Sequence, residues 1–545
     1  MTLRAAVPDW LVSTAGEAPV LFVAPHGGRR PARRESETSA TRKVNDLHTA
    51  EITLEMAGAL QAPAVVNPSE DRNRVDLNRV SHVRARAPWL LELLLEAVRA
   101  QIAAVGEATV LFIHGWNAIQ PSCDVGIGAR VADDALVPVK QGVPTVPRRF
   151  LPRLAAFAEA ARRGGIEVTL GHRYPAAGRD NMLQVFTSRF AGDDDPRIAE
   201  LARLGAAGRI SAVQLELAVP LRWPGPLRCR AIEAIRHLAA PENGGAASLG
   251  ALESPRLVAR PADHLALEFH DGHAGVGGFA AAERSPSGRR LGRLLLCLGP
   301  RRLGLFTGED PGRPSGELGC MGLEWTRRGE HEARLAYQGP CLTFPRTDPF
   351  LDLEAGLAEA EIGDLDADLV WRPMTARGGP AASLARLGRI EGRIRLDRWT
   401  ASISAPAALQ DGVVPPPASW HEHRALRIPL GSDTFLSISS RRTDGETIQG
   451  QIVHGGRLEP LLSGRVSLRN SANGLAPAAW RVEAVSRSGT LRVFGHVTHA
   501  IPVVRPSLEG KVLTVFGLAR FGAERRVGYG TFEHSQRLDR KGSAP

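Results

Sequence analysis

Two histidines in the first half of the chain directly follow apolar runs that read as buried strands. His26 comes after residues 20–23 (VLFV), and His114 comes after residues 109–113 (TVLFI). The carboxyl ends of strands line the binding crevice of an α/β sheet, and catalytic zinc is often held by two histidines and one carboxylate. The pair indicates a metal site, although each motif alone is equally typical of a histidine hydrogen-bonded within a turn.

Two other segments offer groups that suit hydrolysis of a substrate bearing a carboxylate. Glu216 lies inside the apolar run 210–217 (ISAVQLEL). An unpaired buried glutamate is costly, so Glu216 either pairs with an arginine such as Arg222 or acts as a general base with a raised pKa. Asn78 and Arg79 offer an amide and a planar fork of donors that fit a carboxylate. Alternatively, these two residues only mark the N-terminus of a helix that carries an arginine on the protein surface.

Seven short segments within residues 18–222 resemble, in chain order, the N-formylglutamate amidohydrolase family. They are APHGG, VNDLHTAEI, NRVDLNR, VLFIHGW, CDVGIGAR, RYPAAG and VQLEL. That family is similar in fold to zinc carboxypeptidases and aspartoacylases. The resemblance implies a Zn²⁺ ion held by His26 and His114, with Glu216 as general base and acid. It also implies that Asn78 and Arg79 hold the substrate carboxylate, and Arg74 or Arg79 would stabilise the oxyanion.

The third metal ligand is the point where the chain departs from the carboxypeptidase pattern. Those enzymes place a glutamate three residues after the first histidine, where this chain has Arg29. Asp46 in the segment NDLHTAE best matches the amidohydrolase pattern, and Glu51 is the fallback. Trp116 stands where the family usually has a small polar residue, so the acyl group of the substrate is left open and formylglutamate is not assigned.

The second half of the chain carries a weaker resemblance. Residues 389–397 (RIEGRIRLD), 420–424 (WHEHR) and 528–534 (GYGTFEH) resemble the tandem lipocalin-like family of carotenoid hydratases. Alternation along a strand would put His421 and His423 on one face, as a metal or catalytic pair or simply as a polar strand face. The resemblance implies two β-barrels that bind an apolar or amphipathic ligand.

The positions of apolar runs, helical patterns and turn residues predict the elements that carry these groups. Residues 1–240 alternate strands with helices, which predicts an α/β three-layer zinc-hydrolase domain (phosphorylase/hydrolase-like) with a mostly parallel sheet. Its expected strands are 20–23, 64–67, 109–113, 166–170 and 210–217, and its expected helices are 47–60, 88–105, 149–163 and 229–239. After a linker at 241–249, short strands with Gly and Pro turns predict an all-β region, a double lipocalin-like barrel. The barrels are expected at 250–380 and 385–540, with strands such as 291–298, 392–396, 434–439, 480–485 and 491–496, and a loop at 405–417.

Composition narrows the classes of function. The chain has 545 residues and a net charge of +10, but its arginines are scattered, and aromatic residues make up only 5%. We therefore expect no nucleic-acid partner. The five cysteines form no C-x-x-C pair, which argues against a disulfide scaffold or a cysteine zinc site. Neither a signal-peptide pattern nor an apolar run of about 18 residues is present, so we expect a bacterial-type cytoplasmic protein without integral membrane association.

Together these observations predict a zinc-dependent amidohydrolase acting on an N-acyl amino acid or a similar amphipathic amide. Two alternatives come from other classes. The chain could be a non-catalytic protein that binds a lipophilic ligand and whose hydrolase domain has decayed. It could also be a hydratase or isomerase that acts in the β-barrels.

Overall fold

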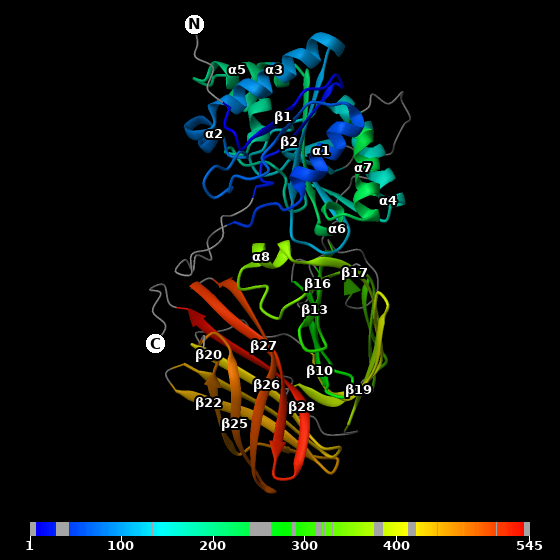
Figure 1. The fold of residues 1–545 in the computed structure, drawn as a ribbon, viewed down its shortest axis with the longest axis vertical. Helices are drawn as coiled ribbons and strands as arrows, with labels where there is room; N and C mark the ends of the chain where they lie inside the picture. Colours follow the sequence, from blue (N-terminus) through cyan, green and yellow to red (C-terminus); the bar gives the residue numbers. More distant parts are fainter. Residues whose placement is uncertain are drawn as a thin grey trace. The chain divides into compact units, whose positions relative to one another are not determined.

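The computed structural model divides the chain into two compact units, Met1–Arg256 and Leu257–Pro545, coloured blue to green and green to red in Figure 1. The expected linker at 241–249 lies outside the described residues. The structure describes residues 7–28, 43–132, 135–239, 263–285, 290–310, 319–320, 322–329, 331–374, 385–411, 421–443, 445–471, 474–507 and 510–538.

Within its described residues, the first unit contains a seven-stranded sheet in the order β1-β3-β2-β4-β9-β5-β8. Strands β3, β2, β4 and β9 run parallel to one another, and β5 joins β9 antiparallel. The sheet is thus mostly parallel, as the sequence predicts. Its strands are β1 (Val12–Thr14), β2 (Val20–Ala24), β3 (Ala64–Val66), β4 (Ala108–Gly115), β5 (Ser122–Gly126), β8 (Glu167–Leu170) and β9 (Ile210–Leu217), and a separate ribbon pairs β6 (Ala129–Ala132) with β7 (Ala135–Pro138).

Helices cover both faces of this sheet, which gives the predicted three layers (Figure 1). Alternating apolar residues of the central strands point to opposite sides. Phe22 and Ile113 pack with α1, α4 and α7, whereas Leu21 and Phe112 pack with α2, α3 and α5. The helices are α1 (Thr49–Leu60), α2 (Val80–Arg86), α3 (Pro88–Val105), α4 (Leu151–Arg163), α5 (Pro196–Ala206), α6 (Val219–Arg222) and α7 (Pro226–Ala239), with 3-10 turns η1 (Arg148–Phe150), η2 (Met182–Phe186) and η3 (Ser188–Phe190).

The second unit begins with a closed barrel, in agreement with the predicted lipocalin-like region. Strands β10 to β13 and β16 to β19 form its wall among the described residues, and pairing of β13 with β16 closes it. Strands β14 and β15 extend from β16. The elements are β10 (Asp263–Asp271), β11 (Val276–Arg284), β12 (Arg290–Leu298), β13 (Arg302–Asp310), β14 (Gly319–Cys320), β15 (Leu323–Arg327), β16 (Ala333–Phe344), α8 (Leu353–Ala358), β17 (Glu361–Pro373), β18 (Arg386–Leu396) and β19 (Trp399–Asp411).

A second, open sheet follows as a half-barrel, in the order β23-β22-β21-β20-β28-β27-β26-β25-β24 for the described residues. Its concave core contains Leu426, Ile428, Trp480 and Phe532. The strands are β20 (Glu422–Leu430), β21 (Thr434–Arg442), β22 (Glu446–His454), β23 (Arg457–Pro460), β24 (Ser463–Asn470), β25 (Pro477–Ser486), β26 (Gly489–Ser507), β27 (Gly510–Ala523) and β28 (Arg526–Leu538).

The division between the two sheets differs from the expected one. Strands β18 and β19 pair with β17 and β10 and complete the first barrel, so that barrel extends past residue 385. The prediction of a loop at 405–417 is also wrong for residues 405–411, because these residues belong to β19. The run of alanines and one proline there looked irregular, but its alternate residues Ala405 and Ala407 are buried in the barrel core. Residues 412–417 lie outside the described part of the chain.

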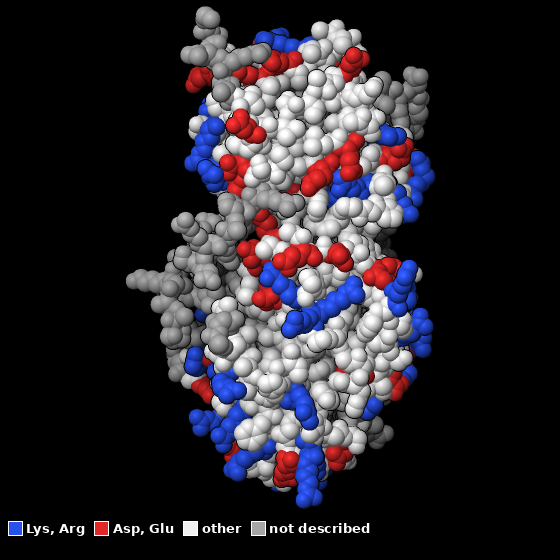
Figure 2. Space-filling view, viewed as in Figure 1, with Lys and Arg blue, Asp and Glu red and all other residues white. Residues whose placement is uncertain are grey.

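No helix in the described residues is both long enough and apolar enough to cross a membrane. On the face drawn in Figure 2, basic and acidic side chains are interspersed and form no extended block of one sign.

Two histidines, the buried His270 and the partly buried His423, make the second unit sensitive to acid. Burial lowers the pKa of His270 to about 4, and burial together with Arg441 lowers that of His423 to about 4. The unfolded chain takes up these protons near pH 6.5, so the stabilisation is complete above that pH and is lost as the pH falls towards 4. At pH 5.5 each histidine is expected to remove on the order of 1 kcal/mol from the free energy of unfolding.

This pH dependence can be measured by thermal unfolding of the full chain between pH 7.5 and 4.5. The His270 Nδ1–H donates to the Gly530 carbonyl oxygen at 3.1 Å, a bond that asparagine can reproduce without titrating. The His270→Asn variant should therefore lose less stability than the parent as the pH falls. Identical pH profiles for parent and variant would contradict the assignment.

Candidate functional site

The parallel order of the central strands brings the predicted site residues to one edge of the sheet. His26 follows β2, His114 lies near the end of β4, and Glu216 lies near the end of β9. β4 is hydrogen-bonded to both β2 and β9, and His114 is the register partner of Glu216. Because paired residues of parallel strands point to the same face, these side chains share one environment.

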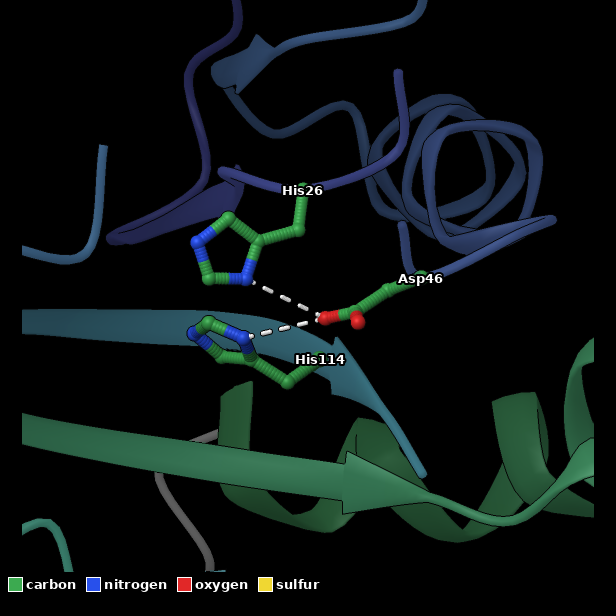
Figure 3. A group of neighbouring side chains, drawn as sticks. All are labelled: His26, Asp46 and His114. Atoms are coloured by element: carbon green, nitrogen blue, oxygen red, sulfur yellow. Dashed lines mark hydrogen bonds and ion pairs between the residues drawn. The ribbon is translucent and has the colours of Figure 1, made fainter. Parts of the chain in front are cut away.

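His26, Asp46 and His114 form a buried group in which three possible metal-ligand atoms lie within 4.8 Å of one another (Figure 3). The Oδ2 atom of Asp46 is 3.3 Å from Nδ1 of His26 and 3.2 Å from Nδ1 of His114. Backbone pairing fixes the approach, since the Asp46 N–H donates to the His26 carbonyl oxygen at 2.8 Å. The three residues are 1–4% exposed, so the group is shielded from water.

The hydrogen bonds of His26 test whether this group fits a metal ion. Its Nε2 lies 2.6 Å from Oδ1 of Asp76, a carboxylate that can only accept, so Nε2 carries the hydrogen. In a neutral ring, Nδ1 is then an acceptor that faces another acceptor, Oδ2 of Asp46. A cation between these atoms resolves the conflict, and two imidazole nitrogens with one carboxylate oxygen are a donor set typical of zinc. The residues therefore fit a bound metal ion.

Charges around Asp46 keep it ionised in spite of burial. Burial alone would raise its pKa, but the positive charge of Arg72, and then the neighbouring His114 and His26, hold the pKa well below its usual value. Nη1 of Arg72 donates to Oδ1 of Asp46 at 2.9 Å, which leaves Oδ2 directed at the histidines. Burial also lowers the pKa of His114 to about 4, so that ring is neutral and able to bind a metal.

Asp76 is a site residue to which sequence reasoning gave no role. Its Oδ1 accepts hydrogen bonds from His26 Nε2 and from the backbone N–H of Asn78 at 3.1 Å. A carboxylate that holds the far nitrogen of a metal-binding histidine fixes the ring and raises its basicity. The feature of the sequence that could have pointed to Asp76 is its position within the segment NRVDLNR.

Replacing this carboxylate should weaken metal binding without removing a ligand. The Asp76→Asn variant is expected to lower zinc affinity by roughly 10- to 100-fold, measured by chelator competition on metal-free protein. Asp71→Asn serves as the control, because Asp71 is also buried but accepts hydrogen bonds from Asn45 and Asn73 rather than from His26. Equal affinities for Asp76→Asn and the parent would rule out this supporting role.

Glu216 lies beside the group in an environment that favours its protonated form. Burial, and then the negative charge of Asp46, raise the pKa of Glu216 to about 8. Its Oε1 accepts a hydrogen bond from Gln214 Nε2 at 2.8 Å. The side-chain oxygen Oε1 of Gln214 in turn accepts from Asn78 Nδ2 at 3.2 Å and from Asn181 Nδ2 at 3.1 Å. A chain of amides thus links Asn78, the expected substrate-binding residue, to Glu216.

The remaining expected residues are not all brought to this group. Arg79 lies near it, with Nε 3.8 Å from Oδ2 of Asp76. Arg74 does not take the expected place, because 72% of its side chain is exposed and it pairs with Glu70. Arg72, two residues earlier, is the arginine that contacts Asp46. Glu51 lies on α1, where 45% of its side chain is exposed and it pairs with His48; the carboxylate beside the histidines is Asp46.

No family model matches the chain, and a search of curated proteins finds no match. Solved structures similar to it include the N-formylglutamate amidohydrolase from Ralstonia eutropha JMP134, with 15% identity, 42% of this chain and 95% of that chain covered, and a TM-score of 0.29. They also include kievitone hydratase from Nectria haematococca (11% identity, 52% and 90% covered, TM-score 0.36). A third is CghA (11% identity, 51% and 88% covered, TM-score 0.34). An N-formylglutamate amidohydrolase and a hydratase are therefore both among the similar solved structures.

Trp116, two residues after His114, forms an aromatic pair with Tyr174. Their rings meet edge to face, with centroids 6.0 Å apart, and the Arg173 guanidinium lies 5.3 Å from the Trp116 ring. Trp116 is 8% exposed, and its Nε1 is buried without a hydrogen-bond partner among the described residues. Burial raises the pKa of Tyr174, although the neighbouring Arg173 opposes this.

A second buried polar group lies in the half-barrel. Glu422 accepts a hydrogen bond from His534 Nε2 at 2.8 Å and from Arg424 Nε at 2.8 Å. Both Glu422 and His534 are less than 9% exposed. Strand alternation puts Glu422 on the same face as the core residues Leu426 and Ile428 and leaves His421 and His423 on the other face, where His421 is exposed. Trp420, part of the quoted motif, lies outside the described residues.

Proposed function

We propose that the first unit is a zinc-dependent amidohydrolase that cleaves the amide bond of an N-acyl amino acid or a similar amide bearing a carboxylate. The observation that carries the proposal is the buried group His26, Asp46 and His114, with Glu216 on the strand next to His114. Catalytic zinc sites commonly use three such protein ligands and leave a position open for water or substrate.

Glu216 is the residue to which we assign proton transfer. A zinc ion at the site would polarise the scissile carbonyl and make water a better nucleophile. Glu216 would accept a proton from the attacking water and deliver it to the leaving nitrogen as the C–N bond breaks. Its raised pKa suits a group that must both take and return a proton near neutral pH.

Arginines and an amide on the segment before α2 are the proposed substrate-binding groups. Asn78 and Arg79 would bind the substrate carboxylate, as the sequence resemblance implies. Arg72 replaces Arg74 as the second candidate for stabilising the oxyanion, because its Nε is buried without a hydrogen-bond partner among the described residues. Buried donors aimed at a developing negative charge are the usual means of such stabilisation.

The test combines metal content with substrate specificity. Purified protein is expected to contain about one zinc per chain and to release an amino acid from N-acyl amino acids but not from the matching N-acyl amines, which lack the carboxylate. Protein that takes up no zinc, even when zinc is supplied, would refute the proposal. Equal rates with both substrate classes would refute carboxylate recognition.

We propose further that the β-barrel unit binds the apolar part of the substrate. The length of the acyl chain tests this addition. If short-chain and long-chain N-acyl amino acids are cleaved equally well by the full chain, the barrels have no part in recognition. A preference for long chains would support a substrate that is amphipathic.

A hydratase activity in the second unit is the alternative function, favoured by the buried Glu422–His534 pair. His534 and Arg424 hold the pKa of Glu422 at about 2 although burial opposes this, so the carboxylate is ionised at neutral pH. A Glu422→Gln variant of the full chain separates the two functions. Amide hydrolysis that survives in Glu422→Gln and is lost in Glu216→Gln places the activity in the first unit, and the opposite pattern places it in the second.

A further inference from the structure

Arg222 is a fully buried cation to which the proposed reaction gives no task. It ends the short helix α6, directly after β9, and is 0% exposed. Sequence reasoning offered it as a partner for Glu216. In the described part of the chain, however, its guanidinium donates its hydrogen bonds to backbone carbonyl oxygens and not to a carboxylate. A buried charge without an ion partner is costly, so this placement calls for a reason.

The three acceptors belong to three of the segments that carry the site. Nε donates to the Leu217 carbonyl at 3.0 Å, Nη2 donates to the Trp116 carbonyl at 3.0 Å, and Nη1 donates to the Leu47 carbonyl. Leu47 follows Asp46, Leu217 follows Glu216, and Trp116 is two residues after His114. One planar group therefore connects the backbone beside two candidate ligands and the candidate base.

The surroundings leave the guanidinium little freedom to move. A Cβ atom on Gly115 would lie 2.4 Å from Cζ of Arg222, so only glycine allows the strand to approach so closely. The Trp223 ring lies 5.2 Å from the guanidinium on another side. Arg228 Nη1 donates to the Arg222 carbonyl oxygen at 2.9 Å, which fixes the backbone from which the side chain extends.

We infer that Arg222 is a positioning residue, which sets the spacing of Asp46, His114 and Glu216 by joining the three backbone segments behind them. The inference rests on the proposed function of this site. Lysine cannot replace the guanidinium, because its ammonium group lacks the rigid planar fork that reaches three acceptors in fixed directions. The positive charge also interacts favourably with the ionised carboxylate of Asp46.

The test compares Arg222→Lys with Arg153→Met in the full chain. Arg153 is the control, since its side chain is only 17% exposed and its guanidinium is held by Glu107 on a segment that carries no site residue. Zinc affinity of the metal-free protein is measured by chelator competition, and kcat and KM are measured for an N-acyl amino acid. Arg222→Lys should lose roughly 10- to 100-fold in zinc affinity and lose kcat more than KM, whereas Arg153→Met should stay within about threefold of the parent.

Gly115→Ala provides a second route if Arg222→Lys does not fold. It retains the guanidinium but displaces it, so it should weaken zinc binding in the same direction. Zinc affinity in either folded variant equal to that of Arg153→Met would overturn the positioning role while leaving the proposed function intact. A parent protein that binds no zinc would instead refute the proposed function itself.

Discussion

Replacement of Glu216 by glutamine is expected to lower kcat for amide hydrolysis by about 100- to 10,000-fold, the usual contribution of a general acid–base group. Glutamine has the same shape and can still accept the hydrogen bond from Gln214 with its amide oxygen. The loss would therefore reflect the missing proton transfer rather than a distorted site. Steady-state kinetics with an N-acyl amino acid would give the magnitude.

Metal analysis of Glu216→Gln distinguishes a loss of proton transfer from a loss of zinc binding. Zinc content should remain about one per chain in Glu216→Gln, because Glu216 is not among the three grouped ligand atoms. A variant that keeps both zinc and full activity would show that another group moves the proton. Loss of zinc together with activity would instead point to Glu216 as a ligand.

Loss of either histidine should have the second large effect. His114→Ala and His26→Ala are each expected to lower zinc affinity by more than about 100-fold, which is beyond the range for residues that only support a ligand. His114 Nε2 has no hydrogen-bond partner among the described residues, so its replacement breaks few other contacts. Elemental analysis of the purified variants gives the bound zinc directly.

His48→Ala is the control for these two variants. His48 is close in the chain to Asp46, but its ring packs against Trp223 and pairs with Glu51. It should keep the zinc content of the parent. If His114→Ala and His26→Ala also kept their zinc, the metal would have to bind elsewhere in the chain.

Much of the first unit could be predicted because its signals are local. Apolar runs such as 210–217 mark strands that are buried on both faces, and a histidine at the end of such a run must face the crevice. The observed strand β9 has the predicted bounds, as does helix α3. Chain order alone could also place His26 and His114 at one edge of the sheet.

The features that were missed depend on contacts between distant segments. Arg72 and Arg74 are equivalent in local sequence, and only the turn at residues 71–75 decides that Arg72 faces Asp46 while Arg74 faces solvent. Arg222 looked like a partner for Glu216 because charge suggests an ion pair, whereas the backbone carbonyls that bind it leave no mark in the sequence. The strand at 405–411 was missed because small alanines give a weak strand signal, although the closed barrel requires a strand there.

The open sheet of the second unit has a consequence for behaviour at high protein concentration. Its outer strands β23 and β24 do not pair with each other in the described residues, and such edges are where chains add to one another and aggregate. Strand β23 is four residues long, carries Arg457 and Glu459, and ends at Pro460, while β24 carries two arginines. Short length, charge and proline all discourage the addition of a further strand at these edges. The protein is therefore expected to remain dispersed at high concentration. Variants in which apolar β-branched residues replace these charges are expected to form fibrils.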